Sequence, residues 1–576
     1  MTNHSALSPS RARIRALAVA LVALLLAALL PGAAAQAEPK DKCDTRTNNT
    51  YQKLLECITA EGVFDHQEAF QAIADANEDP FYPGTRAAGT DGYDNSAEYV
   101  ADLLTAAGWK VELDPVDVTF VLPSTLRQLT PVAADYETGA FTGSGSGTVE
   151  GNVIPVDLAL GTTEWPTARA DSTSGCEPED FDGIDWSGDN DIALVQRGAC
   201  NFGNKALNAE TAGAEAIIIF NQGNTPDREG LIVANASTLN DGTSIQHGIP
   251  VVGASFADGV ALAQEGSTAF VEVPPIQTRQ DYNVIAELPG KNDDNVVMAG
   301  AHLDSVIQGP GIQDNGSGSA ALLELALSLS KLEPRNTLRF GWWAAEEQGL
   351  VGSEDYVEGL SQTELDRIAA YLNFDMISSP NFIYGVYDAD ESSFPAPTGV
   401  PIPEGSEALE DLFETYFTWQ GIPYEDSEFS GRSDYQAFIL NGIPASGLFT
   451  GAEVPKTAEQ EEIWEGVTGE QYDPCYHLAC DSLDPDAEEP ERDPAVYAEL
   501  ADENDVVGNV SLEALGVNSD AIAFAVLTLA YSTEDVNGVP GKSVPGSRAL
   551  DLPDEFAGPE GTVGSDGGDG PAHGES

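Results

Sequence analysis

The sequence predicts an α/β protein that is interrupted by a second, β-rich unit. From residue 282 to about 535, continuous apolar strands alternate with helices, which indicates a sheet covered on both faces. Residues 131–276 are instead rich in glycine and threonine, with short, strand-like apolar runs. The 576 residues suffice for more than one compact domain, and a hydrophobic content of 42% is ample for their cores.

Residues 1–37 have the layout of a secretory signal peptide. A basic stretch precedes a continuously apolar segment at 16–30, and small residues follow, with cleavage expected after Ala35 or Ala37. The apolar segment is short for the ~20 residues that a membrane-spanning helix needs, and we identify no later candidate. We therefore expect a secreted, extracellular protein without membrane contact after cleavage.

Residues 38–130 carry helical signals and are the expected N-terminal part of the larger domain. Apolar Tyr99 and Leu103, for example, recur at helical spacing. Helices are expected at 51–60, 65–77 and 96–107. The interrupting unit, 131–276, is expected to contain strands at 191–195, 216–220 and 249–252 and a helix at 205–213.

The larger domain is expected to resume at 277 and to end at 550. Its expected elements are strands at 296–301, 337–344, 371–374 and 443–448 and an amphipathic helix at 319–332. Residues 551–576 are rich in Gly, Asp, Glu and Pro with almost no apolar content, which predicts a disordered tail.

The net charge of −70 excludes nucleic acid as a partner, because a phosphate backbone would be repelled. Solubility is the simplest reason for so acidic a surface. Some of the negative charge must nonetheless be held by cations, so the composition leaves room for a calcium ion, at no identified place.

Six cysteines follow the signal in close sequence pairs: Cys43/Cys57, Cys176/Cys200 and Cys475/Cys480. An even number of cysteines in an exported chain favours disulfides. Metal ligation is the alternative for Cys475 and Cys480. An oxidising environment and the lack of a second Cys-x-x-Cys pair argue against it.

His302 and Asp304 come directly after an apolar strand, at a spacing that places both side chains on one face. The carboxyl ends of strands in α/β sheets are where ligands bind, and an imidazole beside a carboxylate is a common pair at zinc. Asp314 follows ten residues after Asp304, in a Gly/Ser-rich turn. Alone, these residues would equally fit a capping turn with a surface histidine.

Two adjacent carboxylates, Glu346 and Glu347, end the apolar strand at 337–344. Burying both without compensation would be costly. A metal ion removes that cost by taking one as a ligand and leaves the other as a general base. The alternative, an acidic helix start, explains one glutamate more readily than two.

Asp375 follows another apolar stretch, and Tyr476 and His477 lie within the short Cys475–Cys480 loop. Asp375 taken by itself is more typical of a helix cap. Together the motifs nevertheless supply two histidines and three carboxylates, with one further glutamate. Two zinc ions that share a bridging carboxylate need about that set.

In type and order these motifs, over roughly 282–485, resemble the co-catalytic dizinc aminopeptidases typified by secreted bacterial leucyl aminopeptidases. The resemblance implies a zinc exopeptidase-like fold, with a mixed, twisted sheet flanked by helices. It also implies hydrolysis of apolar, Leu-like residues from peptides with free amino termini. We expect a monomer.

The resemblance further implies that His302 and Asp375 bind one zinc, that His477 and Glu347 bind the other, and that Asp314 bridges them. No metal ligand of the family pattern is missing.

The same resemblance gives Glu346 the role of general base for the bridging water. Asp304 would orient the His302 imidazole, and Tyr476 would donate a hydrogen bond to the developing oxyanion. Arg432, in the matching segment 430–434, would shape the pocket around the amino end of the substrate.

Residues 191–217 resemble a protease-associated (PA) domain, with Arg197, Gly198, Cys200, Phe202 and Lys205 among the matching positions. This resemblance implies that the PA domain interrupts the peptidase fold and that Cys176 pairs with Cys200.

Three alternatives remain open. A related dizinc carboxypeptidase or aminoacylase would need a cationic anchor for a substrate carboxylate. A glutaminyl cyclase on the same scaffold would use one zinc. A non-catalytic receptor or binding protein would lack metal ligands, and none is missing here.

Overall fold

The computed structural model describes residues 42–160, 172–188, 190–396, 402–484, 492–550 and 552. The expected signal peptide at 1–37 lies outside the described residues, as does the expected tail at 551–576 apart from residue 552.

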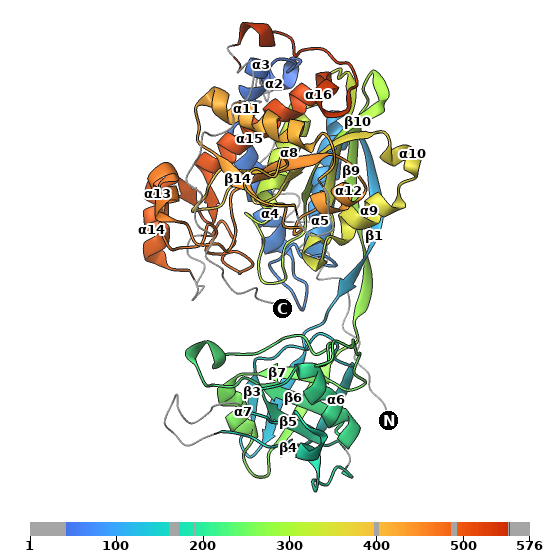
Figure 1. Ribbon diagram of the computed structural model, residues 1–576, viewed down its shortest axis with the longest axis vertical. Coiled ribbons are helices and arrows are strands. Elements are labelled where there is room, and N and C mark those ends of the chain that lie inside the picture. The colour runs from blue at the N-terminus through green and yellow to red at the C-terminus, as the bar shows by residue number, and fades with distance from the viewer. Residues whose placement is uncertain are drawn as a thin grey trace, which may run out of the picture.

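The described chain forms a larger and a smaller unit, each built on its own sheet (Figure 1). The larger unit has an eight-stranded sheet of order β1-β9-β11-β10-β12-β15-β13-β14, and the smaller unit has a seven-stranded sheet of order β3-β2-β8-β4-β5-β6-β7. Two long antiparallel strands, β1 (Lys110–Phe120) and β9 (Gln277–Leu288), belong to the larger sheet and lead to and from the smaller unit.

The other strands of the larger sheet are β10 (Asn292–His302), β11 (Asn336–Trp343), β12 (Ile368–Phe374), β13 (Gly385–Tyr387), β14 (Glu425–Ser427) and β15 (Ala445–Phe449). Its principal helices are α3 (Tyr51–Leu55), α4 (Ala60–Ala76), α5 (Asp91–Ala107), α8 (Gly316–Leu329), α9 (Val351–Gly359), α11 (Ser406–Gln420), α12 (Tyr435–Leu440), α13 (Ala458–Trp464), α14 (Pro494–Glu503) and α15 (Leu512–Tyr531). Shorter pieces are α2 (Lys42–Thr45), α10 (Gln362–Leu365), α16 (Glu534–Asn537), β16 (Val506–Val507), β17 (Val510–Ser511) and the 3₁₀ turns η3 (Glu346–Gln348) and η4 (Ser547–Ala549).

The larger sheet is covered on both faces, as the continuous apolar strands predict. Every residue of β11 and β12 is buried. Trp342 packs into the core that β11 shares with α4, α5, α8, α11 and α15, whereas Trp343 packs into the core shared with α9 and α12. Successive side chains of a strand point to opposite faces, so each tryptophan anchors one layer. The expected mixed α/β sheet is confirmed, because β9 runs antiparallel to its neighbours while β10, β11 and β12 are parallel.

The predicted helices of the N-terminal part exist with different limits. The expected helix at 51–60 is the shorter α3, which ends at Leu55. α4 begins five residues before the helix expected at 65–77, because Thr59 caps it by accepting a hydrogen bond from the Gly62 N–H. Thr90 likewise caps α5, which starts five residues before its predicted first residue. Threonine side chains that satisfy free helical N–H groups thus decide both starts.

The smaller unit contains β2 (Thr125–Thr130), β3 (Ala134–Tyr136), β4 (Gly147–Pro155), β5 (Ile192–Gln196), β6 (Ala216–Phe220), β7 (Val251–Ala254), β8 (Thr268–Val273), α6 (Phe202–Ala212), α7 (Phe256–Leu262) and the turns η1 (Pro178–Phe181) and η2 (Pro226–Arg228). Residues 125–130 were expected to belong to the larger domain, and this prediction is wrong. They form β2, which pairs with β3 and β8 of the smaller sheet. The remaining predicted domain limits stay predictions.

One later helix does meet the length and composition of a membrane span, which corrects the expectation from the sequence. This helix is α15, with 20 residues, but 72% of its apolar window is buried inside the larger unit. It contacts α3, α4, α8 and α11. Its apolar surface is therefore accounted for as protein core.

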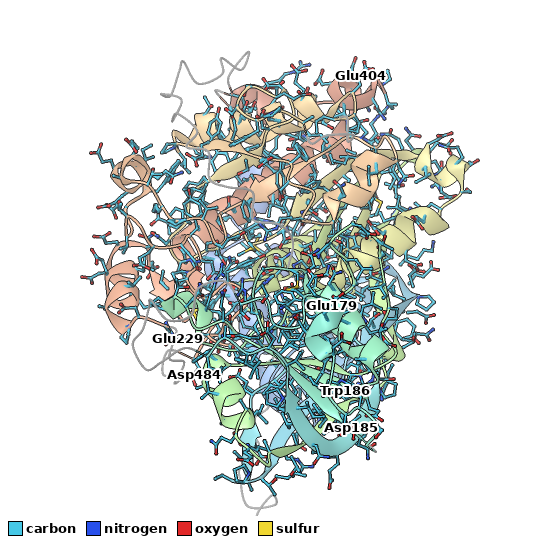
Figure 2. The ribbon with its side chains drawn as sticks, turned by 60° about the horizontal axis from the view of Figure 1, so that its bottom comes forward. Glu179, Asp185, Trp186, Glu229, Glu404 and Asp484 are labelled. Atoms are coloured by element: carbon cyan, nitrogen blue, oxygen red, sulfur yellow. A yellow bond between two sulfur atoms is a disulfide. The ribbon has the colours of Figure 1, made fainter. Side chains whose placement is uncertain are left out.

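All three expected disulfides are present, between Cys43 and Cys57, Cys176 and Cys200, and Cys475 and Cys480. The last closes a loop with a sequence separation of five beside the strand ends of the larger sheet. Exposed acidic side chains occur on both units: Figure 2 shows Glu179 and Asp185 on the smaller unit and Glu404 at the far end of the larger one.

Strand direction places one edge of the larger sheet opposite the smaller unit. β1 runs toward the smaller unit, β9 returns from it, and β11 is antiparallel to β9. The carboxyl ends of β10, β11 and β12 therefore point toward the smaller unit (Figure 1). This is the edge at which ligands bind in α/β sheets.

We expect Gly318→Ala to lower the free energy of unfolding by about 1–3 kcal/mol, because overpacking forces the backbone apart. A Cβ at Gly318, in the first turn of α8, would lie 2.1 Å from the Phe374 carbonyl oxygen at the end of β12. Denaturant unfolding monitored by circular dichroism measures the loss.

The matched control is Gly359→Ala, where a Cβ would meet nothing within 4 Å. Its effect should stay within about 0.5 kcal/mol. Equal stability of the two variants would contradict close packing of α8 against β12.

Candidate metal centre

Side chains from five separate places meet at the carboxyl edge of the larger sheet. His302 is the last residue of β10, Asp375 directly follows β12, and Glu347 lies in η3 after β11. Asp314 comes just before α8, and His477 lies in the loop closed by Cys475 and Cys480. The five predicted ligands thus converge although 175 residues separate the first from the last (477 − 302).

The two histidines are joined through one aspartate. His302 Nε2 lies 3.2 Å from Asp314 Oδ1 and 3.2 Å from Asp375 Oδ1. His477 Nε2 lies 3.3 Å from Asp314 Oδ2 and 3.1 Å from Glu347 Oε2. Each oxygen of Asp314 therefore faces a different histidine, as a carboxylate that bridges two ions would.

The donor set fits zinc. In each of the two triads, His302–Asp314–Asp375 and Asp314–Glu347–His477, the candidate ligand atoms lie within 4.8 Å of one another. Among the described residues, the buried Glu347 Oε1 atom has no hydrogen-bond partner, and neither does Asp375 Oδ1 apart from its 3.2 Å approach to His302 Nε2. Imidazole nitrogen and carboxylate oxygen are the ligands of catalytic zinc, and a cation would satisfy both unpaired oxygens.

The electrostatics also call for a cation. Burial raises the pKa of Glu347 to about 7, with the Asp314 charge adding to the shift. Burial raises the pKa of Glu346 well above its ordinary value as well. For His477, burial lowers the pKa, but the hydrogen bonds to Asp314 and Glu347 outweigh it and raise the pKa to about 10. Buried carboxylates at this density need positive charge nearby.

Three residues at the site adopt the left-handed backbone conformation that non-glycine residues rarely use. They are Ala345 (φ 53°), Met376 (φ 54°) and His477 (φ 57°). Ala345 precedes the Glu346–Glu347 pair, and Met376 follows Asp375. Unfavourable backbone conformations of this kind cluster at functional sites, where surrounding contacts hold them in place.

Asp304 is buried beside His302, but its closest contact to the imidazole is through the main chain. His302 Nδ1 lies 3.1 Å from the Asp304 carbonyl oxygen and 3.6 Å from Oδ1. The Asp304 carboxylate instead accepts hydrogen bonds from the main-chain N–H groups of Glu346 (3.0 Å) and Glu347 (3.3 Å). Asp304 therefore also fixes the turn that carries the two glutamates.

Tyr476 and Arg432 lie together at the exposed side of the site. Arg432 Nη2 donates to the Tyr476 hydroxyl at 3.0 Å, and Nη1 donates to Glu453 at 2.6 Å. The Tyr476 ring stacks on His477 with centroids 3.8 Å apart. Since the hydroxyl accepts from Arg432, its own hydrogen is free to point toward a substrate.

Sequence reasoning missed Ser433, which orients a candidate ligand. Its hydroxyl donates to Asp375 Oδ2 at 2.6 Å and accepts from Asn373 Nδ2 at 2.8 Å. Asp481 acts similarly on another ligand, because its carboxylate accepts from the main-chain N–H groups of Gln313 (2.8 Å) and Asp314 (3.0 Å). Both residues adjoin motifs that the sequence singled out, and that proximity was the signal.

Arg86 was also missed, and no sequence pattern marks it. Its guanidinium is fully buried and donates to the carbonyl oxygens of Leu303, Pro310 and Gly311, in the loop between His302 and Asp314. Burial lowers its pKa to about 10, against the opposing effect of Asp304, Asp481 and Asp314. Arg86 thus both shapes this loop and supplies positive charge beneath it.

Comparisons with known proteins identify the family of this chain. A profile of peptidase family M28 matches residues 283–499, and a PA domain profile matches residues 155–262. An aminopeptidase of Pseudomonas aeruginosa is 43% identical over 493 residues, which cover 84% of this chain and 83% of that relative. Leucine aminopeptidase 2 of Trichophyton equinum is 41% identical over 364 residues, covering 62% and 65%. The solved structure of a zinc aminopeptidase from Bacillus subtilis is 25% identical, with a TM-score of 0.53 over 81% of this chain and 94% of that one.

We expect Ser433→Ala to weaken zinc binding about 10- to 100-fold, because partners that orient a ligand carry that much of the affinity. The change removes the donor to Asp375 Oδ2 without altering any ligand. Competition with a chromophoric chelator measures the affinity.

Ser446→Ala is the matched control, since the buried Ser446 hydroxyl on β15 has no hydrogen-bond partner among the described residues. Zinc affinity that is equal in both variants would show that Ser433 does not position Asp375.

Proposed function

The chain belongs to peptidase family M28 and is a zinc-dependent metallo-aminopeptidase, and we propose that it removes apolar, Leu-like residues from peptide amino termini outside the cell. The observation that carries the proposal is the pair of ligand triads that share Asp314. The ions of such an exopeptidase must be accessible to a peptide from solvent. His477 meets this requirement, because 41% of its side chain is exposed.

We assign two zinc ions to the triads. His302 and Asp375 would hold one ion, His477 and Glu347 the other, and Asp314 would bridge them. The chemistry that zinc supplies at these positions is Lewis-acid polarisation of the scissile carbonyl and acidification of water.

Glu346 is the proposed general base. It is buried beside Glu347 and is not needed by either triad. In this role its carboxylate takes a proton from the attacking water and passes it to the leaving nitrogen as the peptide bond breaks. Asp304 supports the role by fixing the Glu346 main-chain N–H.

Tyr476 is the proposed donor to the oxyanion. Its hydroxyl already accepts from Arg432, so its hydrogen can be directed at negative charge that develops on the carbonyl oxygen. Arg432 therefore positions Tyr476. We also propose that it lines the part of the pocket that receives the amino end of the substrate.

The preference for leucine rests on the resemblance and on the name of the Trichophyton relative. Export is supported by the three disulfides, which form in oxidising compartments.

The monomeric state and the absence of nucleic-acid and membrane partners stay predictions. So does a calcium ion: Glu410, Glu414 and Asp426 offer oxygen donors within 4.8 Å of one another, but carboxylates alone do not define a site.

The purified protein should hydrolyse leucine-4-nitroanilide, lose that activity with 1,10-phenanthroline and regain it with added zinc. Release of nitroaniline is followed by absorbance, and elemental analysis is expected to give two zinc ions per chain. Preferential cleavage of amino-blocked substrates would instead favour the carboxypeptidase or aminoacylase alternative, and one zinc would favour the cyclase.

Glu346→Gln should lower kcat about 10²- to 10⁴-fold, because a general base contributes that much to the rate, while both zinc ions stay bound. The rate on leucine-4-nitroanilide and the zinc content are measured on the same preparation. Exposed Glu354 provides the control: Glu354→Gln should retain wild-type kcat. Full activity of the Glu346 variant would remove this residue from the mechanism.

A further inference from the structure

A cavity of about 420 Å³ lies directly beside the candidate metal centre, where β1 leaves for the smaller unit. Glu347 and Asp304 belong to one wall, together with the segment around Ile307. Phe120 and Val121, at the end of β1, belong to another. The cavity therefore adjoins the reacting groups on one side and the connection between the units on the other.

The walls expose apolar side chains to water. Val121 is 48% exposed and Ile307 is 47% exposed, and both line the cavity. Exposed apolar area costs roughly 25 cal/mol for each Å², so a cluster of it beside an active centre indicates a surface that a ligand covers.

Hydrogen bonds and ring contacts hold the walls in place. The Tyr82 hydroxyl donates to the Val121 carbonyl oxygen, and the Tyr82 and Phe120 rings meet edge to face with centroids 5.5 Å apart. The Thr119 N–H donates to Gln348 Oε1 at 3.0 Å, which ties β1 to the turn that carries Glu346 and Glu347. Ligand sites are usually preformed in this way.

The position of the cavity indicates which part of a peptide it would bind. A general base must lie within hydrogen-bond reach of the nitrogen that it protonates, so the leaving part of the substrate lies on the side of Glu346. Glu347 and Gln348, the next two residues, line the cavity. Arg432 and Tyr476, the proposed neighbours of the substrate's amino end and carbonyl, do not line it.

From this geometry we infer that the cavity binds the side chain of the second substrate residue, the one that becomes the new amino terminus, and that it selects an apolar side chain. The inference rests on the proposed aminopeptidase function. Because Phe120 ends β1 and Val121 directly follows it, the connection to the smaller unit takes part directly in substrate selection.

The test compares Leu-Leu with Leu-Gly, with leucinamide as the reference for each enzyme variant. The two dipeptides differ only in the side chain that would enter the cavity, and the ammonia released from leucinamide does not reach it. For wild-type protein we expect kcat/KM for Leu-Leu to exceed that for Leu-Gly about 10-fold or more, the range for apolar groups in a pocket.

Ile307→Ser and Val121→Ser should each reduce this ratio at least 3-fold, chiefly through the KM for Leu-Leu. The matched control is Ile463→Ser, because Ile463 is 45% exposed on α13 and does not line the cavity. Its ratio should equal that of the wild-type protein.

Two results would overturn the inference while leaving the aminopeptidase function intact. One is a wild-type ratio near 1 with active hydrolysis of leucinamide. The other is an unchanged ratio in both cavity variants, including the case in which all three substrates lose activity in parallel. Failure of the wild-type protein to hydrolyse leucinamide would instead contradict the proposed function itself.

Discussion

The burial of many carboxylates around His302 and His477 is the constraint on which the rest of this structure depends. Two like charges 4 Å apart repel by about 4 kcal/mol at the effective dielectric of a protein, so such a cluster disperses unless it is compensated. Buried Arg86 supplies one positive charge from below, and main-chain N–H groups stabilise Asp304 and Asp481. The unpaired oxygens of Glu347 and Asp375 leave the remaining compensation to metal ions. The same groups that neutralise the cluster also fix its geometry, which is what metal-assisted hydrolysis requires.

The connection between the two units has a consequence for the site. Because β1 and β9 extend the larger sheet toward the smaller unit, strand direction alone turns the carboxyl edge of β10, β11 and β12 in that direction (Figure 1). The end of β1 then lies beside η3, bound through Thr119 and Gln348. An inserted unit attached at this edge can therefore influence substrate binding through its connecting strands, without supplying a residue to the metal centre.

Much of the architecture could be predicted because the relevant signals are local. The apolar runs at 216–220 and 337–344 correspond to β6 and, within one residue, to β11, since a strand buried on both faces tolerates few polar residues. Residues 125–130, which form β2, were assigned to the wrong unit because the partners of a strand leave no signal in its own sequence. The helix α15 was not recognised because it is apolar all round, and such a helix shows no amphipathic period.

The sequence by itself determined which residues are candidate ligands, their order and their position after apolar strands, together with the cysteine pairs and the layout expected of an export signal. Only the tertiary structure decided that Asp314 faces both histidines and that Ser433, Asp481 and Arg86 hold the ligands and their loops. It also decided that a cavity with exposed apolar side chains adjoins Glu347, the residue after the proposed general base Glu346. The physical reason is that ligand identity and strand pattern are written in neighbouring residues, whereas hydrogen bonds such as Ser433 to Asp375 and Asp481 to Asp314 join positions 58 and 167 residues apart.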